Sequence, residues 1–527
     1  MILTVPLGKA LRLYPHKRAV ICGNASWTYG ELGERVNRLS RALLSLGVGQ
    51  GDRVAVLHHN CHRYLECYFG VMQIGAVLVP INYRLSPRYW LGTIEDAGAK
   101  VIVAESSFRE QWESVGDSLD ESCTVVWTPG GLNSGLAHGA LGYEALLSEA
   151  TPLAPPAVVI RADDMAQIYY TSGTTGQGKG VVLTHNNVCV HALGTIAEFK
   201  IDDRDVWLHA APMFHLADAW AVWSITWVGG VHVVVPEFGE QVVLEAMERE
   251  GVTVTDLIPT MLTALVHYPE VNTYDHSSLR LLVSGGSPIP DTVVERTMKT
   301  FDCDFVQGYG LTETSPYVAL SVLKDHLRGL SQEEQMRYRA SAGREYITAE
   351  LRVVDENGSD VRPDGQQVGE IIIRGEGVMK EYWSLPELTR MSFKDGWLYS
   401  GDMAAIDEEG YLTFVDRKRD VIKTAGREVY SAQVENVLYS HPAVLEAAVI
   451  GVPDEEWGQA VKAVVVLKEG HQATEEEIIK FCRERMMRFQ VPKSVDIVLC
   501  LPKTGSAKIA KVLLKEGYWM GTNKAVH

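Results

Sequence analysis

Short apolar runs rich in β-branched residues alternate with helical segments through the first 310 residues of the chain. This alternation is typical of α/β folds with a largely parallel sheet, in which ligands bind beyond the carboxyl ends of the strands. Several runs end in Gly, Ser or Pro, so these ends are the first places to search for a site. The strand-like runs are residues 52–57, 76–82, 100–105, 231–236, 279–286 and 303–310.

An amphipathic helix is expected at residues 29–47. Leu32, Val36, Leu39 and Leu43 share one face of a helix there, and a glycine ends the pattern. The helical and strand-like patterns together predict an α/β protein.

The chain has 527 residues, which is too long for a single compact hydrophobic core. At about 150 residues per domain, it would form three or four structural units. From residue 350 to 415, short alternating strands with turns at "DENGSD", "PDGQ" and "DEEG" predict a small β subdomain. The charged segment "VDRKRDVIKTAG" follows, and the rest has βαβ-like units of domain size. We predict a large N-terminal domain at residues 1–416, with two α/β sheet subdomains and the β subdomain, and a small α+β C-terminal domain at residues 417–527.

The formal net charge of −18 at pH 7 argues against a nucleic-acid partner, because phosphate backbones are held by clustered Lys and Arg. The cysteines are scattered without C-x-x-C pairs, which favours reduced thiols in a cytoplasmic protein over disulfides or a zinc site. No run of about 18 apolar residues occurs, so we expect no integral membrane segment.

The segment "YYTSGTTGQGKGVVLTH", residues 169–185, contains the spacing G-x-x-x-x-G-K of a nucleotide-triphosphate loop. That loop needs Ser or Thr after the lysine and a helix beginning there, whereas Gly180 follows here and "VVLTH" has the pattern of a strand. The segment therefore predicts a glycine-rich loop between two strands, in which hydroxyls and Lys179 bind phosphates. The alternative is a flexible surface turn. The hydroxyls belong to Thr171, Ser172, Thr174 and Thr175.

Two further strand ends have the composition of a nucleotide site. In "GYGLTETSP", residues 308–316, Tyr309 can stack on a purine, Thr312 can bond a phosphate oxygen, and Glu313 can hold Mg²⁺. The small residues of "SGGSP", residues 284–288, permit close approach of a planar base. Each segment alone is equally well explained as an ordinary turn.

Two later segments offer a carboxylate and a set of lysines. In "GWLYSGDMA", residues 396–404, Asp402 is a suitable acceptor for the two hydroxyls of a ribose, although an Asp after Gly is more often a turn residue. The segment "LPKTGSAKIAK", residues 501–511, is rich in lysine. A lysine on a mobile domain can offset the charge that develops when a carboxylate attacks phosphorus, whereas a basic surface stretch is the simpler alternative.

The order of these segments resembles that of the acyl-adenylate-forming superfamily of acyl-CoA synthetases, peptide-synthetase adenylation domains and luciferases. The resemblance covers nearly the whole chain, including "WTYGELGERVNRLSRAL" near the N-terminus. In this family the loop at residues 171–180 binds the pyrophosphate part of ATP and is not a Walker loop. The segments are, in order, the phosphate loop, "PMFH", "SGGSP", "GYGLTETSP", "GWLYSGD", "DRKRDVIKTAG" and "LPKTGSAK".

The resemblance implies that a carboxylate attacks the α-phosphorus of Mg·ATP to give an acyl-adenylate and pyrophosphate. By position, Lys508 would supply positive charge, and Glu313 would hold the metal. The implied catalytic residues are Lys508, Thr312, Glu313 and His215. The implied ATP-binding residues are Thr171, Ser172, Gly173, Thr174, Thr175, Gly176, Lys179, Gly286, Ser287, Pro288, Gly308, Tyr309, Gly310, Leu311, Thr312, Asp402, Arg417 and Lys508.

In the second half-reaction a thiol attacks the adenylate carbonyl. The family rotates its mobile C-terminal domain about a hinge in the segment matching "DRKRD", which withdraws Lys508 and brings the loop around Gly426, at the coenzyme A tunnel, to the site. The hinge residue is Arg419 or Asp420, because Arg419 stands where the family commonly has Asp or Lys.

Three other positions depart from the family pattern. Gly178 replaces the usual proline before Lys179, which should make the loop more flexible. Ala507 replaces the glycine before the catalytic lysine, and Ser400 replaces a threonine. None of these changes removes a charge that the mechanism requires.

The phrase "PMFHLADAW" and the segment after "TETSP" resemble medium- to long-chain fatty-acyl-CoA synthetases, so such a fatty acid is the expected substrate. His215, Trp220, Gly285 and Gly310 would line the acyl pocket, although helix packing explains Trp220 equally well. An aryl acid such as a benzoate or cinnamate stays open, because "PINYRLSP" also resembles ligases for those acids. Asp218 lies slightly before the usual place of an ammonium-binding aspartate, and we interpret it as coincidental.

Coenzyme A is the expected acceptor, with ATP as co-substrate and Mg²⁺ as cofactor, because "PDEEWGQAVKAVVVL" resembles the CoA ligases. A ligase that stops at acyl-AMP or loads a carrier protein is the rival enzyme. A non-catalytic adenylate-binding protein is the rival from another class, and the retention of Lys508 and Glu313 argues against it. A homodimer is expected because relatives often are dimers.

Overall fold

The computed structural model describes residues 1–116, 119, 123–130, 141–171, 178–287, 289–503 and 509–519. The chain divides into two compact units. The first comprises Met1–Glu350 and Ile373–Leu398, and the second comprises Leu351–Ile372 and Tyr399–His527. Within the described ranges, no helix combines the length and apolar character that crossing a membrane requires.

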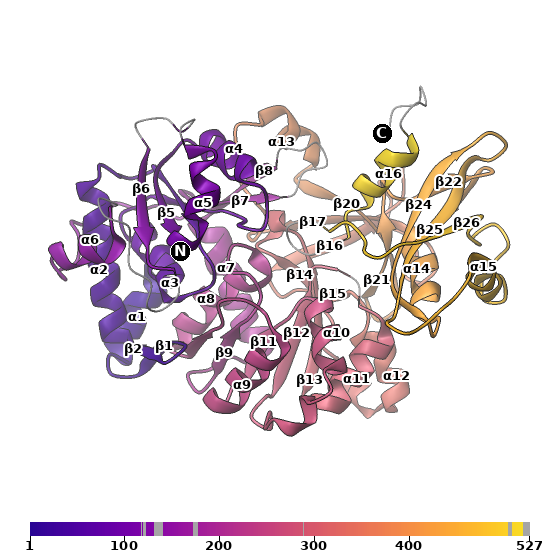
Figure 1. Cartoon of the computed structure of the whole chain (residues 1–527), viewed down its shortest axis with the longest axis horizontal. Coiled ribbons are helices and arrows are strands. Elements are labelled where there is room, and N and C mark those ends of the chain that lie inside the picture. Colours follow the sequence, from indigo (N-terminus) through magenta and orange to yellow (C-terminus); the bar gives the residue numbers. More distant parts are fainter. Residues whose placement is uncertain are drawn as a thin grey trace. The chain divides into compact units, whose positions relative to one another are not determined.

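One sheet of the first unit has the strand order β18-β8-β7-β4-β3-β5-β6. Figure 1 labels its strands β5, β6, β7 and β8. β3 pairs in parallel with β4 and β5, because α3 and α4 carry the chain back between them. β8 runs antiparallel to both β7 and β18. The bounds are β3 (Arg53–Leu57), β4 (Val77–Pro80), β5 (Ala99–Glu105), β6 (Thr124–Thr128), β7 (Met165–Thr171), β8 (Lys179–Thr184) and β18 (Glu381–Tyr382).

The other strands of the first unit have the order β15-β14-β13-β12-β11-β9-β10-β1-β2. From β13 to β1 every pair is parallel, whereas β14, β15 and β2 are antiparallel to their neighbours. The strands predicted at residues 52–57, 76–82, 100–105, 231–236, 279–286 and 303–310 are confirmed as β3, β4, β5, β10, β12 and β13. The bounds are β1 (Arg18–Cys22), β2 (Ala25–Thr28), β9 (Val206–His209), β10 (Val231–Val234), β11 (Val254–Asp256), β12 (Leu281–Gly285), β13 (Asp304–Gly310), β14 (Tyr317–Leu320), β15 (Gly343–Glu345) and β19 (Phe393–Lys394).

Helices connect and cover these strands. Their bounds are α1 (Val5–Leu13), α2 (Tyr29–Ser45), α3 (His62–Gln73), α4 (Pro87–Ala97), α5 (Arg109–Glu113), α6 (Tyr143–Glu149), α7 (His185–Phe199), α8 (Leu216–Val228), α9 (Glu240–Glu250), α10 (Pro259–His267), α11 (Asp291–Phe301), α12 (Gln332–Arg339) and α13 (Pro386–Ser392). The 3₁₀ turns are η1 (Ser106–Phe108), η3 (Val271–Thr273), η4 (Thr312–Thr314) and η5 (Asp325–Gly329).

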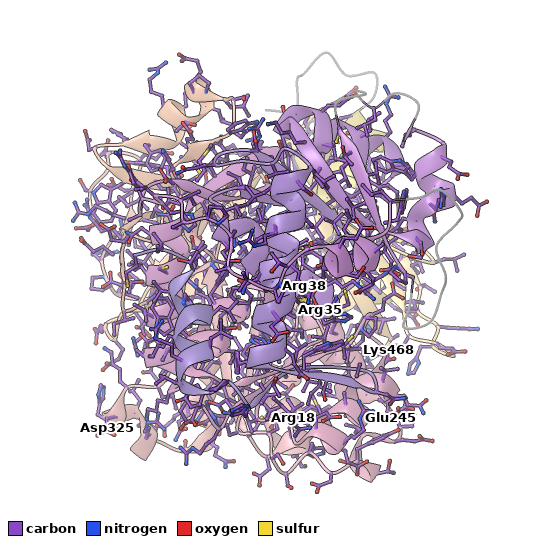
Figure 2. All side chains as sticks on the ribbon, turned by 90° about the vertical axis from the view of Figure 1, so that its left-hand side faces the viewer. Arg18, Arg35, Arg38, Glu245, Asp325 and Lys468 are labelled. Carbon is purple, nitrogen blue, oxygen red and sulfur yellow. The ribbon has the colours of Figure 1, made fainter. Side chains whose placement is uncertain are left out.

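The helix predicted at residues 29–47 is confirmed as α2, and a capping box between Thr28 and Glu31 begins it. Its apolar face is buried as the sequence pattern requires. Arg35, which Figure 2 labels together with Arg38, bonds Glu66 at 2.6 Å and Glu144 at 3.0 Å. These ion pairs tie α2 to α3 and α6.

The second unit contains two groups of strands. β16 (Ala349–Val354), β17 (Gly369–Gly375), β20 (Trp397–Ile406) and β21 (Tyr411–Arg417) neighbour one another in that order. The other sheet has the order β23-β22-β25-β24, with β26 beside β25. Its strands are β22 (Ile422–Thr424), β23 (Arg427–Val429), β24 (Val444–Asp454), β25 (Gly458–Leu467) and β26 (Ser494–Ile497), and its helices are α14 (Ser431–Tyr439), α15 (Glu475–Arg483) and α16 (Lys511–Trp519).

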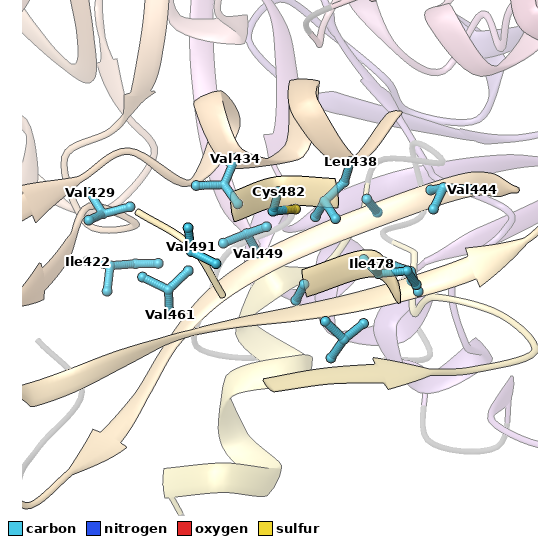
Figure 3. Close-up of a cluster of buried hydrophobic side chains, with 14 residues drawn as sticks. Ile422, Val429, Val434, Leu438, Val444, Val449, Val461, Ile478, Cys482 and Val491 are labelled. Atoms are coloured by element: carbon cyan, nitrogen blue, oxygen red, sulfur yellow. The ribbon is translucent and has the colours of Figure 1, made fainter. Parts of the chain in front are cut away.

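Apolar side chains from α14, α15 and the sheet form the core of this unit (Figure 3). Val434 and Leu438 come from α14, and Ile478 and Cys482 come from α15. They pack against Val449 and its neighbours on the strands, so the predicted α+β character of the C-terminal segment is confirmed.

The chain has eight cysteines, of which Cys22, Cys61, Cys67, Cys189, Cys303, Cys482 and Cys500 are free thiols. Cys22, Cys189 and Cys303 are buried, and burial raises the pKa of each thiol to about 12. Cys482 is also buried, whereas Cys500 is exposed. A thiol with a raised pKa reacts slowly, because the thiolate is the nucleophile.

Candidate active site

The segment that contains G-x-x-x-x-G-K joins β7 to β8, so the prediction of a loop between two antiparallel strands is confirmed. Thr171 faces Lys179 as the last pair of the ladder, and the Thr171 hydroxyl donates to the Lys179 carbonyl at 3.5 Å. Since a strand follows the lysine, this is not the loop that precedes a helix in Walker-type proteins. Ser172, Gly173, Thr174, Thr175 and Gly176 lie outside the described residues.

Gly178 has a steric reason to be glycine. A β-carbon there would overlap the Tyr89 hydroxyl and lie 2.6 Å from the Thr171 carbonyl oxygen. Burial raises the pKa of Tyr89, so its hydroxyl stays protonated. Tyr89, on α4, therefore occupies the space that a side chain at position 178 would need.

Tyr382 contacts both Glu313 and Lys179. The Tyr382 hydroxyl donates to Glu313 Oε1 at 2.8 Å, and Lys179 Nζ lies 5.5 Å from the centroid of the Tyr382 ring. Burial and the Glu313 carboxylate raise the pKa of Tyr382, so the hydroxyl remains a donor. Three segments distant in sequence, namely β8, η4 and β18, thus assemble a carboxylate and an ammonium at the base of the loop.

Sequence reasoning missed Tyr382. It lies in "KEYW", which has no recognisable chemical pattern, and its partner Glu313 is 69 residues earlier. The backbone also supports the carboxylate segment, because Met379 N donates to Glu313 O at 2.7 Å.

Glycines at the ends of β12 and β13 allow close packing of backbone and rings. A β-carbon at Gly310 would overlap the Pro316 carbonyl, and one at Gly308 would overlap the Tyr317 ring. A β-carbon at Gly285 would lie 2.9 Å from Gly308 O. Gly286, Ser287, Tyr309, Leu311 and Thr312 follow at these same ends, and Pro288 lies outside the described residues.

His215 begins α8. Its Nδ1 accepts a hydrogen bond from Ala217 N at 3.0 Å, which caps the helix. The preceding loop is held by Asn60, which donates to Ala211 O at 2.8 Å and accepts from Met213 N at 2.7 Å. The position of His215 after β9 is therefore fixed from both sides.

Trp220 and Asp218 belong to the core. Trp220 is buried, and its ring centroid lies 4.8 Å from that of Trp207. Asp218 accepts from Trp207 Nε1 at 3.1 Å and contacts His209 Nδ1 at 2.6 Å. Both Asp218 oxygens are thus used internally, in agreement with the interpretation that its position is coincidental.

The second unit brings Asp402 and Arg417 together. They face each other across β20 and β21, with Arg417 Nε 3.6 Å from Asp402 Oδ1. Ser400 donates to Ile371 O at 2.6 Å, so the hydroxyl retained at this position joins neighbouring strands. The carboxylate is buried while the guanidinium is partly exposed.

The segment after β21 is anchored to α16. Asp420 pairs with Lys515 at 2.8 Å, and partial desolvation together with the neighbouring Arg417 lowers the pKa of Arg419. An isolated bridge between Lys503 and Ile509 brackets Lys508, which itself lies outside the described residues, as does Ala507.

Lys511 extends this anchoring. Its ammonium pairs with Glu435 at 2.7 Å and donates to Ser431 Oγ at 2.6 Å. Gly426, with φ of 73°, forms the turn between β22 and β23, where a β-carbon would meet no atom within 4 Å. Gly426 is thus required by backbone conformation and not by packing.

The described residues contain no cluster of three or more His, Cys, Asp or Glu side chains able to hold a metal ion. Mg²⁺ bound to nucleotide phosphates takes only one or two carboxylates from the protein. Glu313, oriented by Tyr382, fits that requirement.

The two-unit α/β fold and the likeness to ATP-bound MatB, together with the oriented Glu313 carboxylate near Lys179 at the start of β8, define an enzyme of the adenylate-forming class. The chain belongs to the AMP-binding enzyme family, whose model matches residues 7–383, and the model of the family's C-terminal domain matches residues 433–508. It is an acid–thiol ligase of the AMP-forming type.

Similar proteins extend over nearly the whole chain. A feruloyl-CoA synthase from Amycolatopsis sp is 37% identical over 501 residues, covering 95% of this chain and 96% of the relative. A long-chain-fatty-acid–CoA ligase from Thermus thermophilus is 36% identical over 498 residues, covering 93% and 90%. The crystal structure of ATP-bound MatB from Rhodopseudomonas palustris matches with a TM-score of 0.87 and 28% identity, covering 98% of this chain and 99% of that one.

Proposed function

We propose that this protein is an ATP-dependent acyl-CoA synthetase. A carboxylic acid attacks the α-phosphorus of ATP to give acyl-AMP and pyrophosphate, and the thiol of coenzyme A then displaces AMP to give acyl-CoA. The observation that carries the proposal is the Glu313 carboxylate, held by Tyr382 beside Lys179 at the base of the hairpin loop. This group of side chains matches the charge of a metal-bound triphosphate.

The first step needs positive charge and oriented donors, because two anions must approach one another. Lys508 supplies that charge in the proposed mechanism, and Thr312 bonds the α-phosphate. Mg²⁺, when bound to Glu313, neutralises charge on the phosphates. Tyr309 faces the adenine, and Asp402 with Arg417 binds the ribose.

The second step uses the proposed C-terminal domain, residues 417–527, as a mobile part relative to residues 1–416. Asp420 is the favoured hinge residue, since its ion pair with Lys515 joins the segment to α16. In the proposed second step, the loop around Gly426 lies beside the bound coenzyme A. A homodimer in the cytoplasm remains part of the proposal, and the free cysteines agree with a reducing compartment.

The acid is the open part of the proposal. Identities of 37% to a feruloyl-CoA synthase and 36% to a long-chain-fatty-acid–CoA ligase do not separate an aryl acid from a fatty acid. Trp220 and Tyr317 donate to the Asp256 carboxylate at the end of β11, and the Trp207 ring packs against that of Trp220. This polar and aromatic composition supports an aryl acid as the second candidate beside a fatty acid, because a long alkyl chain prefers an apolar lining.

Pyrophosphate release tests both the reaction and the acid. The purified enzyme with Mg·ATP would be given straight-chain C4 to C18 acids, benzoates and cinnamates, each with and without coenzyme A. We expect turnover that requires coenzyme A, and an optimum in one series identifies the acid. Turnover indifferent to coenzyme A would instead indicate a different acceptor.

Lys508→Ala is the variant that separates an enzyme from a binding protein. The variant should lose about 10²-fold or more of the acyl-AMP formation rate, because the oriented positive charge in the transition state is removed. Lys503→Ala is the matched control, since Lys503 pairs with Glu446 at 2.6 Å just before the same segment. An unchanged rate in Lys508→Ala would overturn the assigned catalytic role.

A further inference from the structure

Asp256 is a carboxylate buried at the ligand-binding edge of the parallel strands. It is the last residue of β11, and only 1% of its surface is exposed. β11 lies between β9 and β12, whose carboxyl ends point the same way. In α/β folds ligands bind at this edge, so a charged group here is well placed to meet one.

One oxygen of this carboxylate is fully used, and the other is not. Oδ2 accepts hydrogen bonds from the Tyr317 hydroxyl and from Trp220 Nε1, the latter at 3.2 Å. Oδ1 is buried and has no hydrogen-bond partner among the described residues. An unsatisfied buried acceptor destabilises a fold, so this atom indicates a hydrogen-bond partner that the described residues do not provide.

Tyr317 connects this carboxylate to the glycines at the neighbouring strand ends. A β-carbon at Gly285 would lie 3.3 Å from the Tyr317 hydroxyl oxygen and 3.1 Å from its ring, and one at Gly308 would overlap the ring. His191 fixes the backbone, because its Nε2 accepts from Tyr317 N at 3.1 Å. Asp256 is therefore one hydrogen bond away from the backbone that we expect to line the acid pocket.

The orientation of the acid follows from the proposed reaction. Its carboxylate must face the phosphates, so the opposite end points into the interior between the strand ends and α8. Burial of Trp220 and Tyr317 makes that interior aromatic. The far end of the acid is then the part that meets Asp256.

A hydroxyl group is the partner that suits this carboxylate. Among the described residues, no Lys or Arg contributes to the pKa of Asp256, and burial raises that pKa to about 7 despite the bonds from Tyr317 and Trp220. A hydroxyl bonds both the ionised and the protonated carboxyl, whereas an ammonium suits only the ionised form. An alkyl end would leave the oxygen unsatisfied.

We propose, on the basis of the synthetase function above, that Asp256 is a specificity-determining residue that accepts a hydrogen bond from a hydroxyl group at the far end of the acid. The preferred substrates are hydroxy acids, and the same acids without the hydroxyl are poor substrates. A site built to bond a hydroxyl discriminates strongly, because the analogue leaves a buried polar group unpaired.

Matched pairs of acids test this directly in the intact enzyme. The kcat/KM for coenzyme A-dependent pyrophosphate release would be measured for 4-hydroxycinnamate against cinnamate, 4-hydroxybenzoate against benzoate, and 4-hydroxybutyrate against butyrate. We expect at least a tenfold preference for the hydroxy acid in one pair or more, on the order of one buried hydrogen bond. The preferred pair distinguishes a phenolic from an aliphatic hydroxyl.

Asp256→Asn tests the residue. The amide keeps one oxygen for Tyr317 and Trp220 and offers N–H donors where Oδ1 stands. The ratio of 4-methoxycinnamate to 4-hydroxycinnamate activity should therefore rise, because the ether oxygen can accept from the amide but cannot donate to a carboxylate. A merely structural role would lower both members of a pair equally. Asp205→Asn is the matched control, because Asp205 is a buried carboxylate paired with Arg280 at 2.7 Å, and its hydroxyl preference should stay unchanged.

Three results would overturn the proposal while leaving the synthetase function intact. They are equal kcat/KM within every pair in the unaltered enzyme, an unchanged ratio of 4-methoxycinnamate to 4-hydroxycinnamate activity in Asp256→Asn, and a preference for 4-aminobenzoate over 4-hydroxybenzoate. Absence of pyrophosphate release with every acid would instead contradict the synthetase function itself. The comparison of acid pairs needs no variant, so it decides the matter even where Asp256→Asn does not fold.

Discussion

Tyr382 orients the proposed magnesium ligand through one hydroxyl. Tyr382→Phe removes the donor and leaves Glu313 free to rotate. A hydrogen bond to a charged group is worth about 1.5–3 kcal/mol, so we expect the apparent Mg²⁺ affinity to fall about tenfold or more. Pyrophosphate exchange at increasing Mg²⁺ concentration measures this.

The control for that change is Tyr274→Phe, which removes a hydroxyl from an external segment of the first unit. Its Mg²⁺ dependence should equal that of the unaltered enzyme. Identical Mg²⁺ curves for both variants would show that Tyr382 does not position the metal ligand.

Asp420 makes a pH-dependent contribution to stability. Burial favours the neutral acid, but Lys515 and Lys511 outweigh it, and the net result is a lowered pKa of Asp420. Its contribution is therefore present above the ordinary Asp pKa of about 4 and is lost as pH falls through the lower folded value. We expect Asp420→Asn to cost about 3 kcal/mol at pH 7.

Urea unfolding of Asp420→Asn and the unaltered protein at pH 7, 5 and 3.5 checks this contribution. The difference in unfolding free energy should persist at pH 5 and shrink at pH 3.5, because the Asp420 carboxyl of the unfolded chain takes up its proton below about pH 4. A difference that is the same at all three pH values would rule out the ion pair with Lys515 as its source.

Sequence reasoning found residues of chemically typical kinds, and it missed the residues that hold those side chains through hydrogen bonds. Glu313 was a candidate because a carboxylate after a predicted strand can hold Mg²⁺, and Asp402 was a candidate because a carboxylate can accept the two hydroxyls of a ribose. Both roles stay predictions. Tyr382 and Asp256 were not, since each acts through a partner far along the chain. The roles assigned to Lys508 and to the hydroxyls of the loop stay predictions.

Tyr89 on α4 limits the size of the residue that the β7–β8 hairpin can carry at position 178. Gly178→Pro would restore the residue usual in the family but would force ring atoms into the Tyr89 hydroxyl. We expect this variant to lower the rate of acyl-AMP formation about tenfold and to lose about 1–3 kcal/mol of stability through overpacking.

Replacing Tyr89 in the Gly178→Pro variant tests whether overlap with the Tyr89 hydroxyl causes the loss of activity. Tyr89→Ala with Gly178→Pro removes the overlapping ring and should recover most of the lost activity, and Tyr89→Ala alone should have a small effect. Double-mutant coupling near zero would show that Tyr89 is not the obstacle.

Strands were the elements most accurately predicted, because central parallel strands need β-branched residues on both faces. The loop between β7 and β8 was predicted for a local reason, the strand pattern after Gly180. Pairing of β18 with β8 was not predictable, since nothing in a two-residue strand specifies a partner about two hundred residues earlier.

The two units should unfold separately. Lys511→Met leaves Glu435 buried without its cation, which typically costs about 3–5 kcal/mol. In a unit of this size the loss lowers the melting temperature by on the order of 10 °C. Calorimetry should therefore show two unfolding transitions, one for each unit. Lys511→Met should lower the melting temperature of only the transition that belongs to the second unit.

Glu66→Gln provides the complementary change in the first unit, because Glu66 pairs with Arg35 at 2.6 Å. Glu66→Gln should lower the melting temperature of the transition that belongs to the first unit. A single transition that both changes shift alike would contradict independent units.

The division of the chain was only partly visible in the sequence. The change to short strands near residue 350 was predictable from turn residues. The return of Ile373–Leu398 to the first unit was not, because it depends on tertiary pairing such as that of Tyr382 with Glu313. The boundary at residue 416 therefore remains a prediction.

The unequal exposure of the cysteines makes the natural chain suitable for site-selective labelling. Cys500 is exposed and lies three residues before Lys503, whereas thiols such as Cys22 and Cys303 are buried with raised pKa values. A maleimide dye at neutral pH should therefore attach first to Cys500, since thiolate and access both control the reaction. Fluorescence from that dye would report the surroundings of the C-terminal segment during turnover, in a protein with no engineered cysteine.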